Sequence, residues 1–487
     1  MNLTQKTIDK YEAVIGLEVH AQLLTKTKAF SAERNEYGNL PNTNTGPISL
    51  GHPGTLPLLN EKSIEFAVRL GLACQSNIRS ENQFARKNYF YADLPKGYQI
   101  TQDKTPICTG GAIVIKNDNG ESKRIGLTRI HIEEDSGKSI HDISPFETLI
   151  DLNRAGVPLL EIVSEPDMRS AGEAYSYLTE VRKLVRYLEI CDGNMEEGSL
   201  RCDANVSIRK KGAGEFGTRV EIKNLNSIRN VKRAIEFECL RHIEVVENGG
   251  QIQQTTLTFN AASGETSMMR TKEEADDYRY FPEPDLQPFI VTKDYIEEVR
   301  KTLPPLPAEL FEKYITRYGL SEYDASVLTD DKHFALYFES LLDFVKNPKS
   351  AANWMMGEIK GHINEQAIEI KEFELSPRQL AELINLVDEG KMGRTLASQQ
   401  LFPLMLQNPT QAARSLAEAH QLVQVGDESE LQAWIQNAVE KYPDKVAEYK
   451  GGKKGILGLF MGEVMRLSNG KADPKKTNEL IRKALEN

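Results

Sequence analysis

Five short segments between residues 14 and 223 alternate apolar side chains with charged or amide side chains, and this pattern limits the fold more than any other feature. Successive side chains of a β-strand point to opposite faces. Residues 200–208 show the pattern most clearly, with polar positions at Arg201, Asp203, Asn205 and Ser207. The alternation predicts a sheet with one apolar face and one charged face.

The other four segments place similar side chains at alternate positions. They are residues 14–22 with Glu18, His20 and Gln22, residues 127–135 with Arg129, His131 and Glu133, residues 159–165 with Glu161 and Glu165, and residues 219–223 with Arg219, Glu221 and Lys223. One such strand alone is more often a solvated surface or a row of ion pairs. Five together favour a site for a cation and a polyphosphate, because Mg²⁺ binds carboxylate and phosphate oxygens.

The length and the change of pattern along the chain predict an α+β protein of three domains. A chain of 487 residues exceeds what one hydrophobic core usually serves. Residues 1–295 are expected to form a mainly antiparallel β domain, with helices over residues 61–74 and 171–190. An all-α domain is expected over residues 296–408, with a proline-rich linker at residues 303–307 near its start, and residues 409–487 are expected to form a helical tail. Helices are expected over residues 308–318, 321–327, 331–345, 351–364 and 376–388.

Composition excludes several classes of protein. No apolar run approaches the roughly 18 residues of a membrane-spanning helix, and the first ten residues are too polar for a signal peptide. The five cysteines are scattered and never spaced as CxxC, which favours a reducing, cytoplasmic location. The sequence contains no Walker A, GxSxG or HExxH motif, so it supports neither a P-loop nor nucleophilic hydrolysis.

The net charge of −11 is unevenly distributed. Residues 441–487 carry eleven Lys and Arg against six Asp and Glu, a local balance of +5, so the other 440 residues carry −16. A basic end is compatible with binding of nucleic acid. The candidate contacts there are Lys450, Lys453, Lys454, Arg466 and Lys471.

Two glycines in this tail would share one face of a helix. Gly458 and Gly462 are four residues apart, and each glycine costs a helix about 1 kcal/mol. A close approach of another group should offset that cost. Either a neighbouring helix or an RNA backbone fits.

Three loops also carry candidate site residues. Residues 86–100 contain Lys87, Tyr89 and Lys96, and fit contacts to phosphate and a base or, equally, a loop of packed tyrosines. Arg154 follows a polar turn, where it would stabilise phosphoryl charge or pair with Asp151. Residues 271–285 are densely polar and aromatic, which fits a domain seam or a lid over a site.

These segments together resemble the B-subunit family of the aspartyl/glutamyl-tRNA amidotransferases. The matching stretches run in order along nearly the whole chain: GLEVHAQL, LGHPGTLPLLN, RKNYFYADLPKGYQI, HIEEDSGKS, DLNRAGVPLLEIVSEPD, GSLRCDANVSI, VEIKNLNS, EEADDYRYFPEPDL, GLSEYDASVLT, NPKSAANWMMGEI and GKADPKKTNELI. The resemblance implies a cradle domain that binds ATP and Mg²⁺, a helical middle, and a YqeY-like tail that holds tRNA.

The resemblance also implies a reaction and partners. The side-chain carboxylate of Glu-tRNA(Gln) or Asp-tRNA(Asn) would be phosphorylated by ATP, and ammonia would then give Gln-tRNA(Gln) or Asn-tRNA(Asn). Such an enzyme is a carbon–nitrogen ligase with glutamine as amido donor. A partner glutaminase A subunit would supply the ammonia, and a small C subunit would complete a heterotrimer without a membrane.

The matching motif positions also imply roles for individual residues. The resemblance implies Glu18, His20, Glu133 and Glu161 as metal ligands, and Glu133, Glu161 and Arg154 as catalytic residues. Looser candidates for nucleotide or substrate contact are Lys87, Tyr89, Lys96, Ser199, Arg201, Asp203 and Asn205.

One stretch departs from the family pattern. Many members hold zinc with two cysteine pairs in the stretch that matches residues 30–51. The corresponding positions here are Ser31, Glu33, Gly46 and Ser49. None offers a thiolate, so no zinc is expected, and packing around Tyr37 and Leu40 is expected to hold the loop instead.

Two other functions fit parts of the pattern. A scaffold that only holds tRNA would have the basic tail but would not couple ATP cleavage to tRNA. A free-standing metal-dependent phosphoesterase would use the charged face but would need neither partner chains nor a basic tail.

Overall fold

The computed structural model describes residues 3–141, 143–271, 278–423, 428–468, 470 and 472–486. The chain forms two compact units, Met1–Leu306 and Pro307–Asn487, which divide within the proline-rich segment 303–307. Among the described residues, no helix has both the length and the apolarity needed to cross a bilayer. The division into three domains stays a prediction.

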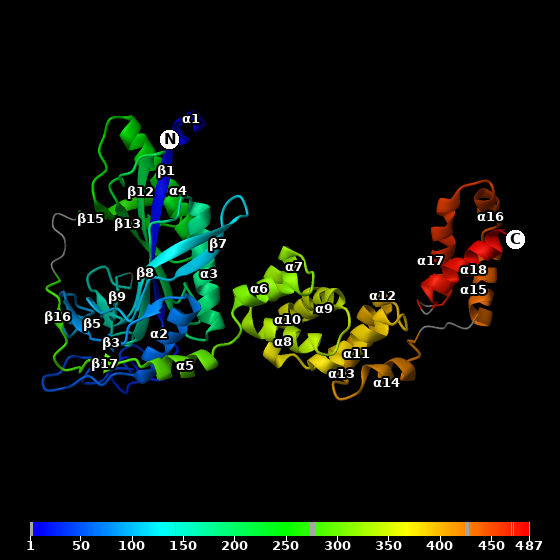
Figure 1. Cartoon of the computed structure of the whole chain (residues 1–487), viewed down its shortest axis with the longest axis horizontal. Coiled ribbons are helices and arrows are strands. Elements are labelled where there is room, and N and C mark those ends of the chain that lie inside the picture. Colours follow the sequence, from blue (N-terminus) through cyan, green and yellow to red (C-terminus); the bar gives the residue numbers. More distant parts are fainter. Residues whose placement is uncertain are drawn as a thin grey trace. The chain divides into compact units, whose positions relative to one another are not determined.

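A 10-stranded sheet forms the centre of the first unit (Figure 1). The five predicted strands are confirmed and lie next to one another, in the order β13 (Val220–Leu225), β12 (Leu200–Lys210), β1 (Tyr11–Gln22), β11 (Pro158–Ser164) and β8 (Ser122–Glu134). All pairings among them are antiparallel, and the register sets Glu18 opposite Asp203 and Glu161 opposite both His20 and His131. Register therefore gathers their polar side chains on one face.

Helices cover the apolar face of this sheet. They are α2 (Glu61–Ala73), α3 (Ala171–Tyr187) and α4 (Ile228–Glu247). Their inward residues share one buried cluster with strand residues such as Val19 and Ile132. Burial of this face stabilises the strand register, and the charged face is left for binding.

The helix α4 was not predicted from the sequence. Two of its inward positions are Glu238 and His242, both fully buried, and they interrupt the apolar spacing that predicts a helix. Arg241 donates to the Glu238 carboxylate at 2.8 Å, and His242 Nε2 lies 3.2 Å from it. A second unpredicted helix, α5 (Lys293–Lys301), crosses the expected domain end at residue 295.

The remaining elements of the first unit are short or lie toward the edges. They are α1 (Gln5–Ile8), β2 (Asn77–Ile78), β3 (Glu81–Asn82), β4 (Ala85–Asn88), β5 (Tyr98–Thr101), β6 (Cys108–Thr109), β7 (Ala112–Lys116), β9 (Lys138–Ile140), β10 (Leu149–Asp151), β14 (Thr255–Asn260), β15 (Glu265–Thr271), β16 (Phe281–Pro282) and β17 (Phe289–Ile290).

Polar contacts hold the loop between β1 and α2, and the expected packing around Tyr37 and Leu40 is wrong. Their side chains are 73% and 77% exposed. Asn42 Nδ2 donates to the Ile150 carbonyl at 2.9 Å, and Asn153 Nδ2 donates to the Leu40 carbonyl at 2.7 Å. Amide side chains therefore replace the apolar packing that the sequence suggested.

Three of the four positions where the family pattern led us to expect cysteines, Glu33, Gly46 and Ser49, contact one another. The Glu33 carboxylate lies against Gly46, where a Cβ atom would fall 1.6 Å from Oε1. The Gly46 amide donates to Ser49 Oγ at 3.0 Å. The lack of zinc stays a prediction, which elemental analysis of the purified protein tests.

The second unit is helical, as predicted. Its helices are α6 (Pro307–Thr316), α7 (Glu322–Leu328), α8 (Lys332–Leu342), α9 (Pro348–Trp354), α10 (Lys360–Gln366), α11 (Pro377–Asp388), α12 (Arg394–Leu396), α13 (Phe402–Gln407), α14 (Ala413–Ala419), α15 (Glu428–Lys441), α16 (Pro443–Lys450), α17 (Leu457–Leu467) and α18 (Pro474–Glu486). Two π-helical turns, Met355–Ile359 and Ala397–Leu401, continue α9 and α12. The last four helices share a buried cluster that includes Leu431, Phe460 and Ile481.

Candidate functional site

A cavity of about 430 Å³, here called the polar cavity, lies on the charged face of the sheet. It is lined by Glu18, His20, Lys87, Thr101, Gln102, Asp103, Thr128, Arg129, His131, Glu133, Glu161, Val163, Asp203, Asn205, Arg219, Glu221, Lys223, Tyr278 and Tyr280. All five predicted strands or their ends contribute. The structure therefore brings Glu18, Glu133 and Glu161 into one cavity.

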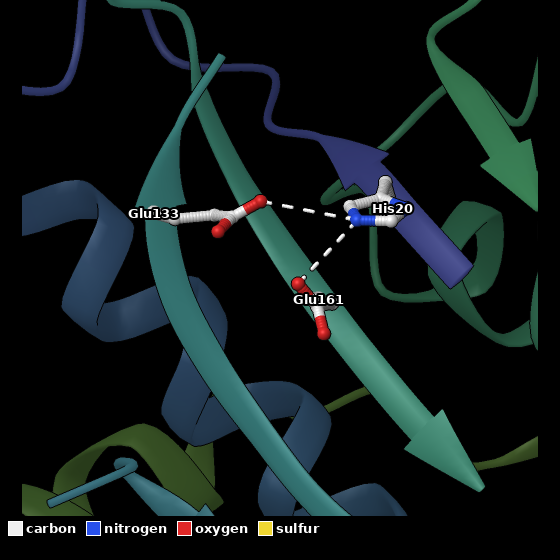
Figure 2. A group of neighbouring side chains, drawn as sticks. All are labelled: His20, Glu133 and Glu161. Carbon is white, nitrogen blue, oxygen red and sulfur yellow. Dashed lines mark ion pairs between the residues drawn. The ribbon is translucent and has the colours of Figure 1, made fainter. Parts of the chain in front are cut away.

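His20, Glu133 and Glu161 form a first group of possible metal ligands. Figure 2 shows the three side chains pointing toward one another from three strands, and their ligand atoms lie within 4.8 Å of one another. His20 Nε2 is 3.4 Å from a Glu161 oxygen and 3.9 Å from a Glu133 oxygen. His131 Nε2 lies just beside them, 3.5 Å from Glu161.

In this group, burial and neighbouring charges shift the pKa values of His20 and Glu161 in opposite directions. Burial alone would lower the pKa of His20, but the hydrogen bond and charge of Glu161 outweigh it and raise that pKa to about 8. Burial would raise the pKa of Glu161, but His131 and His20 hold it well below its usual range. A proton on His20 and a metal cation would therefore compete for the same carboxylate.

Glu18, Asp203 and Glu221 form a second group, whose ligand atoms also lie within 4.8 Å of one another. Burial, followed by the charge of Glu161, raises the pKa of Glu18. Asn205 Nδ2 donates to Glu18 at 3.1 Å. A cation bound beside the buried Glu18 carboxylate would favour its charged form.

The donor set of both groups suits a hard divalent cation. Five of the six residues are carboxylates, and Mg²⁺ prefers oxygen ligands. Glu18 was predicted to bind the metal together with Glu133 and Glu161, whereas the structure places it in the second group. Both groups line one cavity, so a metal-bound polyphosphate would meet them together.

Cations and aromatic rings form another part of the cavity wall. Lys87 Nζ lies 4.8 Å from the centre of the Tyr278 ring. Burial alone would lower the pKa of Lys87, but the charge of Glu133 and other neighbours raises it above its ordinary value. Lys223 pairs with Asp203 and lies 3.1 Å from Glu221. Such ammonium groups can bind phosphate oxygens beside the carboxylates.

Two predicted arginines point to Asp135 and do not line the cavity. Arg201 donates to the Asp135 carboxylate at 2.7 Å, and Arg154 Nε lies 3.7 Å from it. Arg154 also donates to the carbonyl oxygens of Ser136 and Gly137 at 2.9 and 2.6 Å. Burial would raise the pKa of Asp135, but these two guanidinium groups lower it. Arg154 therefore orders the turn after β8 and does not pair with Asp151.

Three other candidates are also held outside the cavity wall. Lys96 pairs with Glu134. Ser199 Oγ donates to Asp192 at 3.1 Å, and the Tyr89 hydroxyl donates to Gln99 at 3.2 Å. Each is therefore hydrogen-bonded or ion-paired to a neighbouring residue of the first unit, and two of these neighbours, Glu134 and Gln99, are buried.

Several cavity residues were not selected from the sequence. Arg129, His131, Arg219, Glu221 and Lys223 occupy predicted polar positions and line the cavity. Taking every polar residue of the alternating segments would have found them. Tyr278 and Tyr280 come from the stretch 271–285, which therefore borders the site, although its residues 272–277 lie outside the described part.

The predicted tRNA contacts lie near the ends of short helices. Lys450 ends α16, Lys454 begins a 3₁₀ turn, and Arg466 lies in the last turn of α17. All three are exposed, as is Lys453, which pairs with Glu448 at 3.2 Å. Lys471 lies outside the described residues.

The glycine face of α17 is open. A Cβ atom at Gly458 or at Gly462 would meet no atom of the described residues within 4 Å. A neighbouring helix therefore does not explain these glycines within the described structure. The alternative that an RNA backbone approaches this face stays a prediction.

The sequence matches two family models. Residues 13–297 match the GatB/GatE catalytic domain, and residues 336–485 match the GatB domain. Similar proteins are the aspartyl/glutamyl-tRNA(Asn/Gln) amidotransferase B subunits of Chlorobium phaeobacteroides (49% identical, covering 98% of this chain and 99% of the relative) and Alkalilimnicola ehrlichii (49%, covering 98% and 100%). That of Thermodesulfovibrio yellowstonii is 47% identical, covering 98% and 99%. The chain belongs to the family of aspartyl/glutamyl-tRNA(Asn/Gln) amidotransferase B subunits.

Proposed function

We propose that this chain uses ATP to activate the side-chain carboxylate of Glu-tRNA(Gln), Asp-tRNA(Asn) or both, and then converts it to the amide. The observation that carries this proposal is the convergence of two carboxylate groups and several cations in one cavity. Such a site can hold a metal-bound polyphosphate beside a second negatively charged reactant. The names of the relatives support the choice of tRNA substrates.

The first step must bring two negative groups together. An oxygen of the substrate carboxylate attacks the γ-phosphorus of ATP, the bond to ADP breaks, and an acyl phosphate forms. Bound Mg²⁺ would neutralise charge on the transferring phosphate. Glu133, Glu161 and His20 would hold one such ion, and the second group would hold another. Lys87 and Arg219, which line the cavity, would bind phosphate oxygens and orient them.

The second step forms the amide. Ammonia attacks the acyl carbon, the carbon–oxygen bond breaks, phosphate leaves, and the nitrogen loses a proton. We infer that a glutaminase A subunit supplies this ammonia and that a small C subunit joins the two. The relatives are named as one lettered subunit of an amidotransferase, which supports an assembly of several chains, and a tRNA substrate favours a cytoplasmic location.

The basic tail would hold the body of the tRNA. Lys450, Lys453, Lys454 and Arg466 are exposed on residues 428–486, and each can neutralise a backbone phosphate. The open face at Gly458 and Gly462 would let that backbone approach α17 closely. Lys471 is a further candidate for the same role.

The decisive test is tRNA-dependent ATP cleavage by the chain assembled with its A and C subunits. Misacylated tRNA should stimulate ADP formation, and Glu133→Gln should abolish the stimulation while the complex stays folded and still binds tRNA. Glu165→Gln is the matched control, because Glu165 accepts a hydrogen bond from Thr128 and does not line the cavity. Stimulation that survives Glu133→Gln would leave this chain as a tRNA-holding scaffold.

A further inference from the structure

A small three-stranded sheet beside the polar cavity carries one of the charged residues that line it. The middle strand of this sheet is β4, between β16 and β5. Arg86, Lys87 and Asn88 follow one another in β4, so Arg86 and Asn88 point to one face and Lys87 to the other. Lys87 lines the polar cavity, whereas Arg86 and Asn88 do not. The two residues that flank Lys87 are therefore available to hold the strand against its neighbours.

Arg86 binds a buried carboxylate with two parallel hydrogen bonds. Its Nε donates to Glu283 Oε2 at 2.7 Å, and its Nη2 donates to Glu283 Oε1 at 2.8 Å. Glu283 is only 1% exposed. The same Nη2 donates to Asp285 at 3.0 Å, and the guanidinium lies 4.1 Å from the centre of the Tyr98 ring. Such a fork fixes orientation as well as distance, so it holds residues 283–285 against β4 in one arrangement.

Backbone contacts attach the preceding residues to the same strand. β16 pairs antiparallel with β4 and sets Phe281 opposite Arg86. The Asn88 backbone amide donates to the Tyr278 carbonyl at 3.0 Å, and Asn88 Nδ2 donates to the Arg279 carbonyl at 2.8 Å. β4 therefore fastens this segment at both ends, through Asn88 at one end and Arg86 at the other.

The fastened segment forms part of the cavity wall. Tyr278 and Tyr280 line the polar cavity, and the centres of their rings lie 5.9 Å apart in an edge-to-face arrangement. The Lys87 ammonium lies over the Tyr278 ring. A shift of the segment would therefore move the ring against which Lys87 packs.

Stability alone does not account for a buried ion pair at this place. Apolar residues of similar volume often stabilise a protein at least as well, because burying two charges removes them from water. A forked arginine–carboxylate pair differs from an apolar pair in that it fixes direction. Arg86 and Glu283 therefore suit the role of holding one geometry.

We propose that Arg86 and Glu283 are positioning residues, whose ion pair holds Lys87 against Tyr278 so that the ammonium group meets the transferring phosphate. The inference rests on the proposed function and adds to it two residues that do not line the cavity. Orientation matters because a small misplacement of an orienting group can lower a rate by roughly 100-fold. No bond forms or breaks at either residue.

Arg86→Lys tests the proposal in the assembled three-subunit complex, because lysine keeps the charge and loses the fork. The kcat of tRNA-dependent ATP cleavage should fall about tenfold or more, whereas the Kd for misacylated tRNA should not change. Arg241→Lys is the matched control and should leave kcat unchanged. Arg241 also binds a fully buried carboxylate through a fork, that of Glu238, but it lies on α4, which covers the opposite face of the central sheet.

A double-mutant cycle shows whether Arg86 acts through Lys87. Arg86→Lys should lower kcat much less in a Lys87→Ala background than in the wild type, because the group that it positions is then absent. Equal losses in the two backgrounds would overturn the proposal.

A further variant separates positioning from folding. Arg86→Met combined with Glu283→Leu replaces the ion pair with apolar residues, so the complex should stay folded while kcat stays as low as in Arg86→Lys. Wild-type kcat in this variant would show that the pair only holds the fold, and would also overturn the proposal. Failure of the proposed function looks different, because the wild-type complex itself would then show no tRNA-dependent ATP cleavage.

Discussion

The polar cavity and the basic surface of residues 428–486 both concentrate charge, but they hold it in opposite ways. In the cavity, Glu133 and Glu161 are only 4% and 8% exposed, and strand register sets the distances between charged groups. In the tail, Lys450 and Lys454 are exposed on the ends of short elements. The cavity is thus organised for one geometry, whereas the tail can adjust to a flexible polyanion.

This difference has a measurable consequence. A nearby group cannot replace a buried charge that has several fixed neighbours. Removing such a charge should therefore cause a large loss of activity that does not depend on salt. The charge of an exposed cation is screened within about 10 Å at moderate ionic strength. Removing such a cation should therefore cause a small loss of tRNA affinity that depends on salt and grows with each cation removed. The following predictions test that contrast.

The largest effect is expected at the centre of the cavity. Glu161→Gln removes the carboxylate that faces both His20 and His131, so tRNA-dependent ATP cleavage should fall by about 100-fold or more. Steady-state ADP formation measures it. Glu165→Gln, four residues further along the chain, should stay within about twofold of wild type. Comparable losses in the two variants would mean that the cavity does not organise the chemistry.

His20 should make the first unit dependent on pH. Its pKa is raised from the ordinary 6.5 to about 8, so its pairing with Glu161 contributes roughly 2 kcal/mol. That contribution is fully present below about pH 6.5 and is lost as the pH rises through about 8. In metal-free buffer, the gap in unfolding free energy between wild type and His20→Gln should therefore shrink from about pH 6 to about pH 9. An equal gap at both pH values contradicts the assignment.

The tail should respond to salt instead. Lys450→Ala combined with Lys454→Ala should weaken tRNA binding severalfold and lower the slope of log K against log salt by roughly 1.4–1.8. Filter binding at several salt concentrations measures both quantities. Lys26→Ala combined with Lys301→Ala removes the same charge from the first unit and should leave the slope unchanged. An unaltered slope in the tail variant would exclude these lysines from phosphate contact.

The smallest effect is expected at the glycine face of α17, where stability and binding should move in opposite directions. Gly458→Ala and Gly462→Ala should each stabilise the helix by about 0.5–1 kcal/mol, because nothing described lies within 4 Å of either added methyl group. If RNA uses this face, tRNA affinity should fall a fewfold at the same time. Thermal unfolding measures the change in stability, and filter binding of the same samples measures the change in tRNA affinity. Higher stability with unchanged affinity would show that the face does not contact RNA.

The sequence predicted the sheet well because its signal is local and repeated. Alternation placed Glu18, His20, Glu133 and Glu161 on one face, and the structure confirms that face. It failed at α4, where buried Glu238 and His242 replace apolar residues. Partners from another part of the chain satisfy such groups, as Thr266 does for Glu238, and a short sequence window does not reveal them.

The candidate site was predictable as a face but not residue by residue. Arg201 belongs to the polar side of β12, yet its guanidinium pairs with Asp135. Lys96 is similarly held by Glu134. Tyr278 and Tyr280, in contrast, reach the cavity from a stretch whose role the sequence left open.

The amino-acid sequence alone determined which side chains of each strand share a face, because that follows from the two-residue period of the backbone. Tertiary structure decided which charges converge: Glu18 joined Asp203 and Glu221, and His20 joined Glu133 and Glu161. It also decided that Arg86 pairs with Glu283. Those outcomes depend on how segments far apart in the chain come into register. A local sequence pattern does not predict this register.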